Sequence, residues 1–171
     1  GGSIRANVKS WNILDIPNYE NFLTFFWNNA YELGGCDSTR LGVVAQNKNE
    51  KSRNYNTYYI CKTAGWQKAT ELEYDTYQFG AGNDGELRNG MVNNDKYYVY
   101  ENGAWRVSVN EIENNLGACV IIRESEKHTL NGKYYICENK SWKQVTAEEY
   151  ALGYCTAAKN NVVEKIDDVY Y

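Results

Sequence analysis

Three segments of the chain share one arrangement of aromatic, aliphatic and polar positions. Each begins with two adjacent tyrosines followed by an aliphatic residue, and each has a tryptophan eight positions after the first tyrosine. The segments are 58–66, 97–105 and 134–142, and another tyrosine pair, Tyr170-Tyr171, closes the sequence. The pairs recur at intervals of 39, 37 and 36 residues. Because self-similarity at a fixed period is typical of repeat proteins, the pattern predicts tandem repeats of about 38 residues.

Each repeat is expected to contain a three-stranded antiparallel meander and a short helix, which makes the fold class α+β. The tyrosine pairs, rich in residues that favour strands, predict the middle strand. Asn102-Gly103 and Asn131-Gly132 are typical of two-residue hairpin turns. First strands are expected near 40–46, 87–92 and 123–128, and third strands near each tryptophan.

A helix start signal follows each tryptophan. Thr70, Ser108 and Thr146 each precede a glutamate by three positions, which is the spacing of a capping box. The helices are expected to end near Gly117 and Gly153, and less sharply around 80–82. The glutamates recur in every repeat, whereas a catalytic acid pair would be unique, so we expect them to cap helices. They are Glu73, Glu111 and Glu149.

These signals predict five parts. Residues 1–35 are expected to form an N-terminal helical cap, because 21–33 has the pattern of an amphipathic helix. Repeats are expected over 36–82, 83–118 and 119–154, the second without a disulfide, and a truncated fourth repeat over 155–171.

The five cysteines follow the same period. Cys36 and Cys119 come just after a predicted helix, while Cys61 and Cys137 end a predicted middle strand. Because the start of one strand lies beside the end of its antiparallel neighbour, we predict the disulfides Cys36–Cys61 and Cys119–Cys137. In the middle repeat both positions lose their cysteine together, to Asp84 and Tyr100. Zinc or haem ligation fits less well, since no Cys-x-x-Cys pair is present.

The fifth cysteine, Cys155, has no predicted partner. The period places that partner two residues beyond Tyr171, so we expect the repeat to be cut short and a longer parent protein to continue. Disulfides persist in oxidising compartments. The chain is therefore expected to be extracellular or at a cell surface, with the periplasm as an alternative.

The combined motifs carry a resemblance. Tyr-Tyr-Ile-Cys followed by a tryptophan, the segment Ala-Thr-Glu-Leu-Glu-Tyr-Asp-Thr-Tyr at 69–77, and Tyr-Tyr-Val-Tyr-Glu-Asn-Gly-Ala-Trp-Arg at 97–106 resemble the tandem repeats of exported surface proteins and lipoproteins of Fibrobacter-type fibre-degrading bacteria. The resemblance covers about residues 36–171. It implies an envelope or secreted location and a setting of plant-fibre adhesion or degradation, and it implies no catalytic residue.

The tyrosines are the candidate ligand-binding residues. Successive strand residues face opposite sides, and Ile60, Val99 and Ile136 are expected to face the core. The outer face would then carry a ladder of aromatic rings on which sugar rings could pack, with the side-chain amides of the 22 Asn nearby. Its members are Tyr59, Tyr98, Tyr100 and Tyr135. The alternative is that small stapled repeats use Tyr and Trp as their core, which we favour for the three tryptophans.

Charge and the remaining motifs exclude other classes. The chain has 18 basic and 22 acidic residues, so a nucleic-acid partner is not expected. No apolar run approaches the length of a membrane span. Residues 83–86 lack the alternating acids of a calcium loop, and His128 has no accompanying nucleophile motif. We therefore expect no metal and no cofactor.

The sequence thus predicts a non-catalytic extracellular repeat module that binds a surface, with plant cell-wall polysaccharide as the expected ligand, within a larger adhesion or fibre-degradation protein. The alternative is a structural spacer or protein–protein assembly module of the cell envelope. Catalysis is the least favoured hypothesis.

Overall fold

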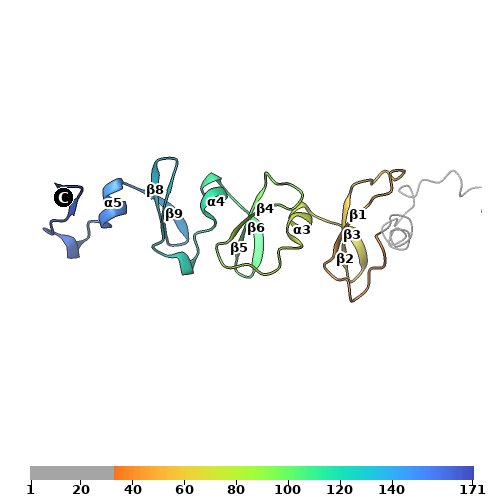
Figure 1. The fold of residues 1–171 in the computed structure, drawn as a ribbon. Coiled ribbons are helices and arrows are strands. Elements are labelled where there is room, and N and C mark those ends of the chain that lie inside the picture. The colour runs from red at the N-terminus through yellow and green to blue at the C-terminus, as the bar shows by residue number, and fades with distance from the viewer. Residues whose placement is uncertain (1–32) are drawn as a thin grey trace, which may run out of the picture. The chain divides into compact units, whose positions relative to one another are not determined.

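The computed structural model describes residues 33–171, which form an α+β protein of short antiparallel sheets and short helices (Figure 1). The cap predicted for residues 1–35 lies outside the described residues, apart from its last three positions. The described residues divide into two compact units, 33–78 and 79–171.

The first unit contains one three-stranded sheet. Strands β1 (Val44–Gln46), β2 (Tyr58–Lys62) and β3 (Gly65–Lys68) are antiparallel with β2 in the middle, and helix α3 (Glu71–Thr76) follows. Across β2 and β3, Cys61 lies opposite Trp66.

The second unit contains two further sheets of the same order and a C-terminal hairpin. The second sheet has β4 (Leu87–Asn89), β5 (Tyr97–Glu101) and β6 (Ala104–Val107), followed by α4 (Glu111–Leu116). The third sheet has β7 (Lys127–Leu130), β8 (Lys133–Glu138) and β9 (Ser141–Val145), followed by α5 (Ala147–Leu152). The hairpin is β10 (Lys165–Ile166) and β11 (Val169–Tyr170), and 3₁₀ turns η2 (Ile121–Arg123) and η3 (Ala157–Lys159) precede the third sheet and the hairpin.

The predicted first strand of the third sheet is displaced. The sequence pattern placed it at 123–128, whereas Arg123 ends η2 and the strand runs over Lys127–Leu130. Arg123 leaves the strand because its side chain is hydrogen-bonded to carbonyl groups at the end of the preceding helix. The middle strands and the hairpin turns at Asn102-Gly103 and Asn131-Gly132 are confirmed, since all four turn residues have positive φ.

Two of the predicted helix starts are confirmed and one is wrong. Thr70 makes both halves of a capping box with Glu73, and the Thr146 hydroxyl accepts from the backbone N–H of Glu149. In the second sheet the cap is Asn110 rather than Ser108, and its side chain accepts from Glu113. Serine and asparagine are both good N-cap residues. Asn110 is the cap because it directly precedes Glu111, the first residue of α4.

Both faces of the middle strand are buried. In the first sheet, Ile60 packs with Val44 and Ala69 on the side where Tyr74 of α3 lies. On the opposite side Tyr59 and Cys61 pack with Trp66. Figure 1 shows each of the three sheets followed along the chain by its helix. The central residues of β2 are therefore enclosed between a helix and a tryptophan, while its two end residues stay partly or fully exposed.

Both predicted disulfides are confirmed. Cys36–Cys61 and Cys119–Cys137 have Cα–Cα distances of 5.4 and 5.3 Å. Each joins the segment before a sheet to the end of its middle strand. Cys155 is unpaired and exposed.

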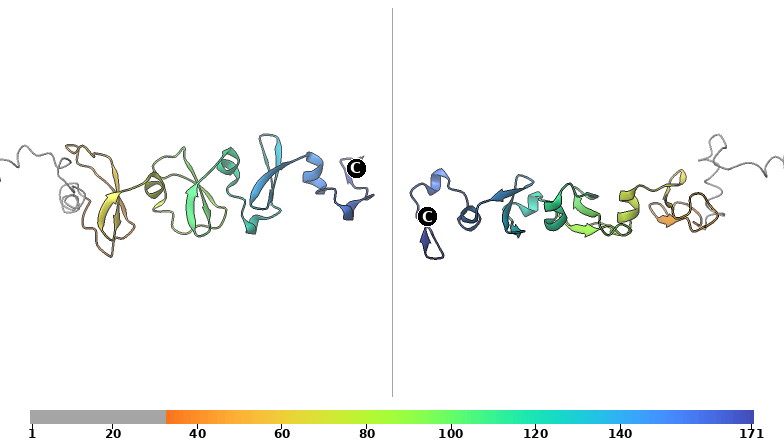
Figure 2. Two further views of the ribbon diagram at one scale, coloured as in Figure 1. Left: turned by 180° about the vertical axis from the view of Figure 1, so that it is seen from behind. Right: turned by 90° about the horizontal axis from the view of Figure 1, so that it is seen from above.

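Helix α4 joins the second sheet to the third. It packs against β4, β5 and β7, and both views in Figure 2 place it between the two sheets. Just beyond it, the Ala118 N–H donates to the Gly85 carbonyl, and Val120 packs on Val99. The segment that follows α4 is thus part of the buried cluster of the second sheet.

Candidate functional site

The predicted tyrosine ladder is wrong for three of its four members. The exposed fractions of Tyr59, Tyr98 and Tyr135 are 3%, 0% and 5%. Tyr100 is half-buried, and its ring stands edge-on to Trp105 with centroids 5.2 Å apart. The alternation rule failed here because it assumes one solvated sheet face, whereas both faces of these middle strands are covered.

The half-exposed aromatic surface lies instead on the first tyrosine of a pair. Tyr58 stacks on Tyr74 of α3 with ring centroids 4.9 Å apart, and Tyr134 packs on Tyr150 of α5 at 5.0 Å. Lys127 lies beside the second pair, with its Nζ 5.5 Å from the Tyr150 ring centre. Both pairs have the same spacing of 16 residues, a signal that the sequence contains and that the strand pattern alone does not reveal.

Each tryptophan binds a backbone carbonyl at the segment that precedes its own sheet. The indole N–H donates to a glycine carbonyl at 2.9 Å from Trp66 to Gly34, at 2.7 Å from Trp105 to Gly80, and at 2.8 Å from Trp142 to Gly117. Gly117 directly follows α4, so its carbonyl belongs to a helix end with no partner of its own.

An arginine covers each of these tryptophans. The guanidinium carbons of Arg40, Arg88 and Arg123 lie 5.1, 5.4 and 4.9 Å from the centres of the rings. We call each group of one tryptophan, one arginine and one glycine carbonyl an indole clamp. Its three examples are Trp66–Arg40–Gly34, Trp105–Arg88–Gly80 and Trp142–Arg123–Gly117.

In two clamps the arginine also binds carbonyl groups. Arg40 donates to Leu33 at 2.9 Å and to Gly35 at 2.6 Å, and Arg123 donates to Leu116 at 2.7 Å and to Ala118 at 3.0 Å. A cation at the carbonyl end of a helix is favourable, because the helix dipole leaves that end negative. The clamp therefore holds the end of α4 against the third sheet.

The clamp of the second sheet differs. Arg88 lies over Phe79 as well as Trp105 and forms an ion pair with Glu86 at 2.9 Å. This sheet has no disulfide, and the ring of Phe79 packs edge-on against Trp105 at 4.9 Å. Aromatic packing occupies the side of the sheet that a disulfide staples in the first and third sheets.

Arg123 interacts with a carboxylate and an imidazole close to Trp142. Arg123 donates to the Glu126 carboxylate and lowers the pKa of that carboxyl to about 2, against the opposing effect of partial burial. His128 adds to the lowering, with its Nε2 2.8 Å from Glu126, and its ring stands edge-on to Trp142. His128, in β7, thus lies beside the clamp of the third sheet.

A second charged group supports the second sheet. Burial alone would raise the pKa of Glu113, but a bidentate pair with Arg106, at 2.7 and 2.9 Å, and the N–H of Val109 lower it instead. Arg106 also binds Glu101 at 2.8 Å. These groups tie α4 to β6.

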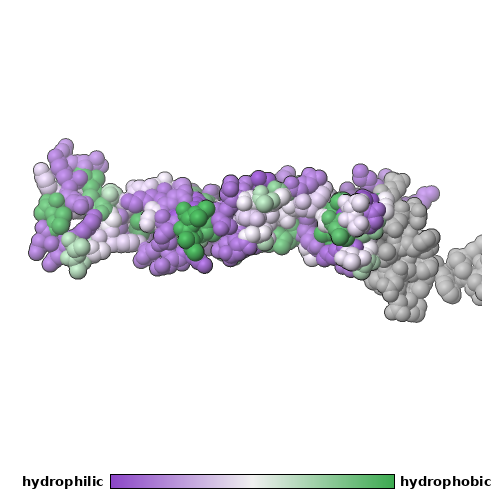
Figure 3. Space-filling view, turned by 90° about the horizontal axis from the view of Figure 1, so that it is seen from below, coloured by the Kyte–Doolittle hydropathy of each residue, from purple (hydrophilic) through white to green (hydrophobic). Residues whose placement is uncertain are grey.

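Neither a metal centre nor a membrane segment stands out in this part of the chain. Among residues 33–171, no three side chains of His, Cys, Asp or Glu lie close enough to hold a metal ion. The helices described over the same residues are too short or too polar to cross a membrane. The face in Figure 3 is mostly hydrophilic, with small separate hydrophobic patches.

Comparison with known proteins adds no relative. No family model, no curated protein and no solved structure matches the chain.

Proposed function

We propose that the chain is a non-catalytic structural module of an exported protein, built from copies of one disulfide-stapled repeat and acting as a stiff spacer or assembly module at the cell surface. The observation that carries the proposal is the indole clamp. It occurs once in each of the three three-stranded sheets, and it binds the segment before the sheet rather than lining a cavity.

Copying of one repeat is supported by matching registers. The last residue of the tyrosine motif lies opposite the tryptophan in every sheet: Cys61 opposite Trp66, Tyr100 opposite Trp105 and Cys137 opposite Trp142. Two of the sheets share the disulfide and the arginine–carbonyl contacts as well. Independent origins would have no reason to reproduce the strand registers, or arginine–carbonyl contacts at separations of 7 and 5 residues in both sheets.

The proposed stiffness is supported by the contacts between the second and third sheets. Between the second and third sheets, one helix packs on both, and Arg123, Trp142 and Ala118 add hydrogen bonds across the junction. A flexible linker would have few such contacts, because backbone freedom survives only where the chain is exposed. A location outside the cytosol is supported by two disulfides that an oxidising compartment would preserve.

Spin labels on the second and third sheets test the stiffness. We place cysteines at the exposed residues Ala104 of β6 and Ser141 of β9 in a Cys155→Ser background and measure the label distance by pulsed electron resonance. A spacer gives one narrow distance distribution, which Trp142→Ala broadens and the exposed change Gln144→Ala leaves narrow. A broad distance distribution in the labelled protein that keeps Trp142 and Gln144 contradicts the proposal.

Polysaccharide binding is the second candidate, and the pairs Tyr58–Tyr74 and Tyr134–Tyr150 favour it. Each presents half-exposed rings beside polar groups, which suits the apolar face of a sugar ring. Folded protein is expected to be retained on insoluble cellulose or hemicellulose, and Tyr134→Ala with Tyr58→Ala is expected to reduce retention at least about threefold. Tyr55→Ala, which removes an exposed ring outside the pairs, is the matched control. No retention on any glycan eliminates this function.

A further inference from the structure

The glutamate at the third position of each helix is paired with a cation after the first and second sheets. Glu73 of α3 lies 3.2 Å from the Lys62 ammonium, and Glu113 of α4 forms its bidentate pair with Arg106. Glu149 holds the same position in α5. Within the described part of the chain, its carboxylate forms no hydrogen bond and no ion pair. The helix of the third sheet therefore has a carboxylate without the cation that its two counterparts have.

The residue that follows the tryptophan explains the difference between the second and third sheets. In the second sheet Arg106 follows Trp105, and its guanidinium also binds Glu101, so that one planar group joins two carboxylates. In the third sheet the equivalent residue is Lys143, and Glu138 takes the place of Glu101. The Lys143 ammonium lies 3.7 Å from Glu138. Because an ammonium is a point charge rather than a planar fork, it does not bind the helix carboxylate as well.

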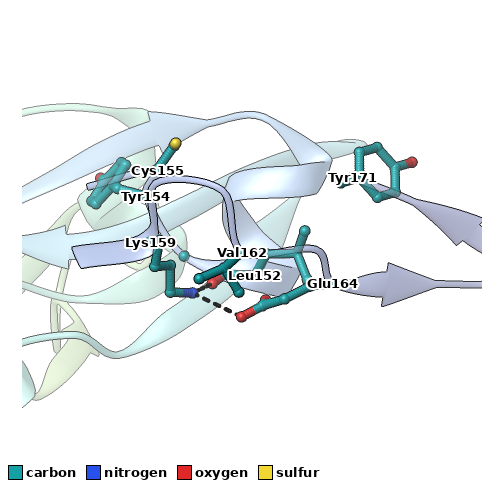
Figure 4. A pocket seen from close by; sticks show the side chains of 8 residues that line it. Leu152, Tyr154, Cys155, Lys159, Val162, Glu164 and Tyr171 are labelled. Atoms are coloured by element: carbon teal, nitrogen blue, oxygen red, sulfur yellow. Dashed lines mark hydrogen bonds and ion pairs between the residues drawn. The ribbon is translucent and has the colours of Figure 1, made fainter. Parts of the chain in front are cut away.

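Two other lysines near α5 are already engaged. Lys127 donates to one backbone carbonyl of α5 at 2.6 Å, and Lys159 donates to another and pairs with Glu164 at 3.4 Å. Figure 4 shows these contacts of Lys159, with the ring of Tyr154 lying apart from them. Neither lysine is therefore available to neutralise Glu149.

A cavity lies beside this carboxylate. It has a volume of about 530 Å³, is open to solvent and is lined by Lys143, Gln144, Val145, Thr146, Glu149 and Tyr154. The Tyr154 hydroxyl donates to Glu138 at 2.8 Å, and the Lys143 ammonium lies 4.9 Å from the centre of its ring. The hydrogen bond to Glu138 and, to a smaller extent, the charge of Glu149 raise the pKa of Tyr154 to about 12. The cavity thus combines an aromatic ring with a carboxylate that has no counter-ion among the described residues.

We propose that this cavity is a docking site for an arginine side chain of another polypeptide. The guanidinium pairs with Glu149 as Arg106 pairs with Glu113, and its flat face lies against the ring of Tyr154. The second sheet shows, within the same chain, a guanidinium held by the equivalent carboxylates. In the third sheet the same carboxylates border an open cavity, so that the guanidinium has room to come from outside.

The charge of the cavity favours a polypeptide partner over free arginine. Two carboxylates and one ammonium, from Glu138, Glu149 and Lys143, give the site one excess negative charge. An arginine within a chain brings a cation alone, whereas the free amino acid also brings a carboxylate that the site repels. The docking site goes beyond the proposed spacer and does not depend on it, because its contacts lie within the third sheet, α5 and the residue Tyr154.

Titration of the full chain with N-acetyl-arginine amide tests the site. The backbone amide resonances of Gln144, Thr146 and Glu149 are followed by NMR, and N-acetyl-citrulline amide, which is neutral and has nearly the same shape, is the matched ligand. We expect the arginine probe to bind at least about tenfold more tightly than the citrulline probe, because only a charged donor gains the ion pair. Equal affinities, or tighter binding of free arginine than of the capped form, overturn the proposal.

Two substitutions separate the site from general attraction to acidic residues. Glu149→Gln keeps the Thr146 cap and is expected to weaken binding of the arginine probe at least about fivefold, whereas Glu148→Gln on the same helix leaves it unchanged. Lys143→Arg supplies a guanidinium from within the chain and is expected to weaken binding by a similar factor, while Lys140→Arg, in the turn before β9, has no effect. The NMR spectra of the free variants establish that each is folded. Binding that survives Glu149→Gln, or that responds equally to both members of either pair, contradicts the proposal.

Discussion

At the scale of the residue, aromatic side chains fill the interior and bind backbone carbonyls, and asparagines occupy turns. Tyr59, Tyr98 and Tyr135 fill the interior, and the indole N–H groups satisfy carbonyls that a helix or turn leaves open. Asparagine is frequent in the turns because it tolerates positive φ better than most residues. Five occupy such positions: Asn56, Asn102, Asn131, Asn139 and Asn161.

Acid is expected to weaken the third sheet through Glu126. Its pKa is about 2 in the folded chain against an ordinary value of 4.5. The folded state therefore binds this proton less readily, so the stability that Glu126 contributes is present above about pH 4.5 and is lost as the pH falls toward 2. Its side chain is 38% exposed, and screening by solvent limits the contribution to about 1 kcal/mol.

The corresponding variant is Glu126→Gln. We expect it to lower the free energy of unfolding by about 1 kcal/mol at pH 7 and by much less near pH 2, as measured by guanidinium unfolding followed through tryptophan fluorescence. The exposed change Glu148→Gln serves as the control. A loss that is the same at both pH values would show that Glu126 acts by packing rather than by charge.

At the scale of the element, short helices and strands form here only because their ends are bound. Each of α3, α4 and α5 has six residues, too few to be stable alone in water. A polar cap starts each one, and in α4 a glycine, an arginine and an indole end it. The predicted box at Ser108 failed because the second sheet has one extra residue before its helix, which transfers the cap to Asn110.

The cap of α4 can be tested by comparing two neighbours. Asn110→Ala is expected to destabilise the second unit by about 1 kcal/mol, since it removes the acceptor for the Glu113 N–H. Ser108→Ala should cost clearly less, because the Asn110 carbonyl to which the Ser108 hydroxyl donates still accepts from the Asn114 N–H. Thermal unfolding of the two variants measures both effects. If Ser108→Ala destabilised the protein more than Asn110→Ala, Ser108 rather than Asn110 would be the N-cap of α4.

At the scale of the whole molecule, stability comes from many small clusters rather than one large core. Each three-stranded sheet has its own tryptophan and its own buried residues, and two of these sheets have a disulfide. Such small cores are marginal without covalent or ionic support. The second sheet obtains that support from Phe79, Arg88 and the Arg106–Glu113 pair.

If the sheets are copies of one repeat, a disulfide should fit the second sheet as well. The clamp glycine is followed two residues later by the cysteine in the first and third sheets, and the residue in that place in the second sheet is Gly82, where a Cβ would lie 3.0 Å from the Tyr100 Cγ. We expect Gly82→Cys with Tyr100→Cys, in a Cys155→Ser background, to form a cross-link. A loop of this length contributes about 3 kcal/mol, and loss of the Tyr100 ring contact with Trp105 offsets about 1 kcal/mol. Unfolding with and without reductant measures the net gain of about 2 kcal/mol. A free thiol pair under oxidising conditions contradicts the common plan.

The candidate site could be predicted from the sequence only in part. The positions of Trp66, Trp105 and Trp142 were evident from their spacing, but their hydrogen-bond partners lie 32, 25 and 25 residues earlier in the chain. Neither strand alternation nor helix periodicity reports contacts of that range. The pairs Tyr58–Tyr74 and Tyr134–Tyr150 were readable as a repeated spacing, although only the fold shows that their rings meet.

The sequence by itself determined the middle strands, two hairpin turns, two helix caps and both disulfides, because these depend on local backbone preferences and on cysteine positions that recur together. Only the tertiary structure decided which faces are buried. Strand alternation assigns a tyrosine to one side of a sheet, but burial depends on what packs against that side. In this protein a helix covers one face of the first sheet and a tryptophan with its preceding segment covers the other, so both faces became interior.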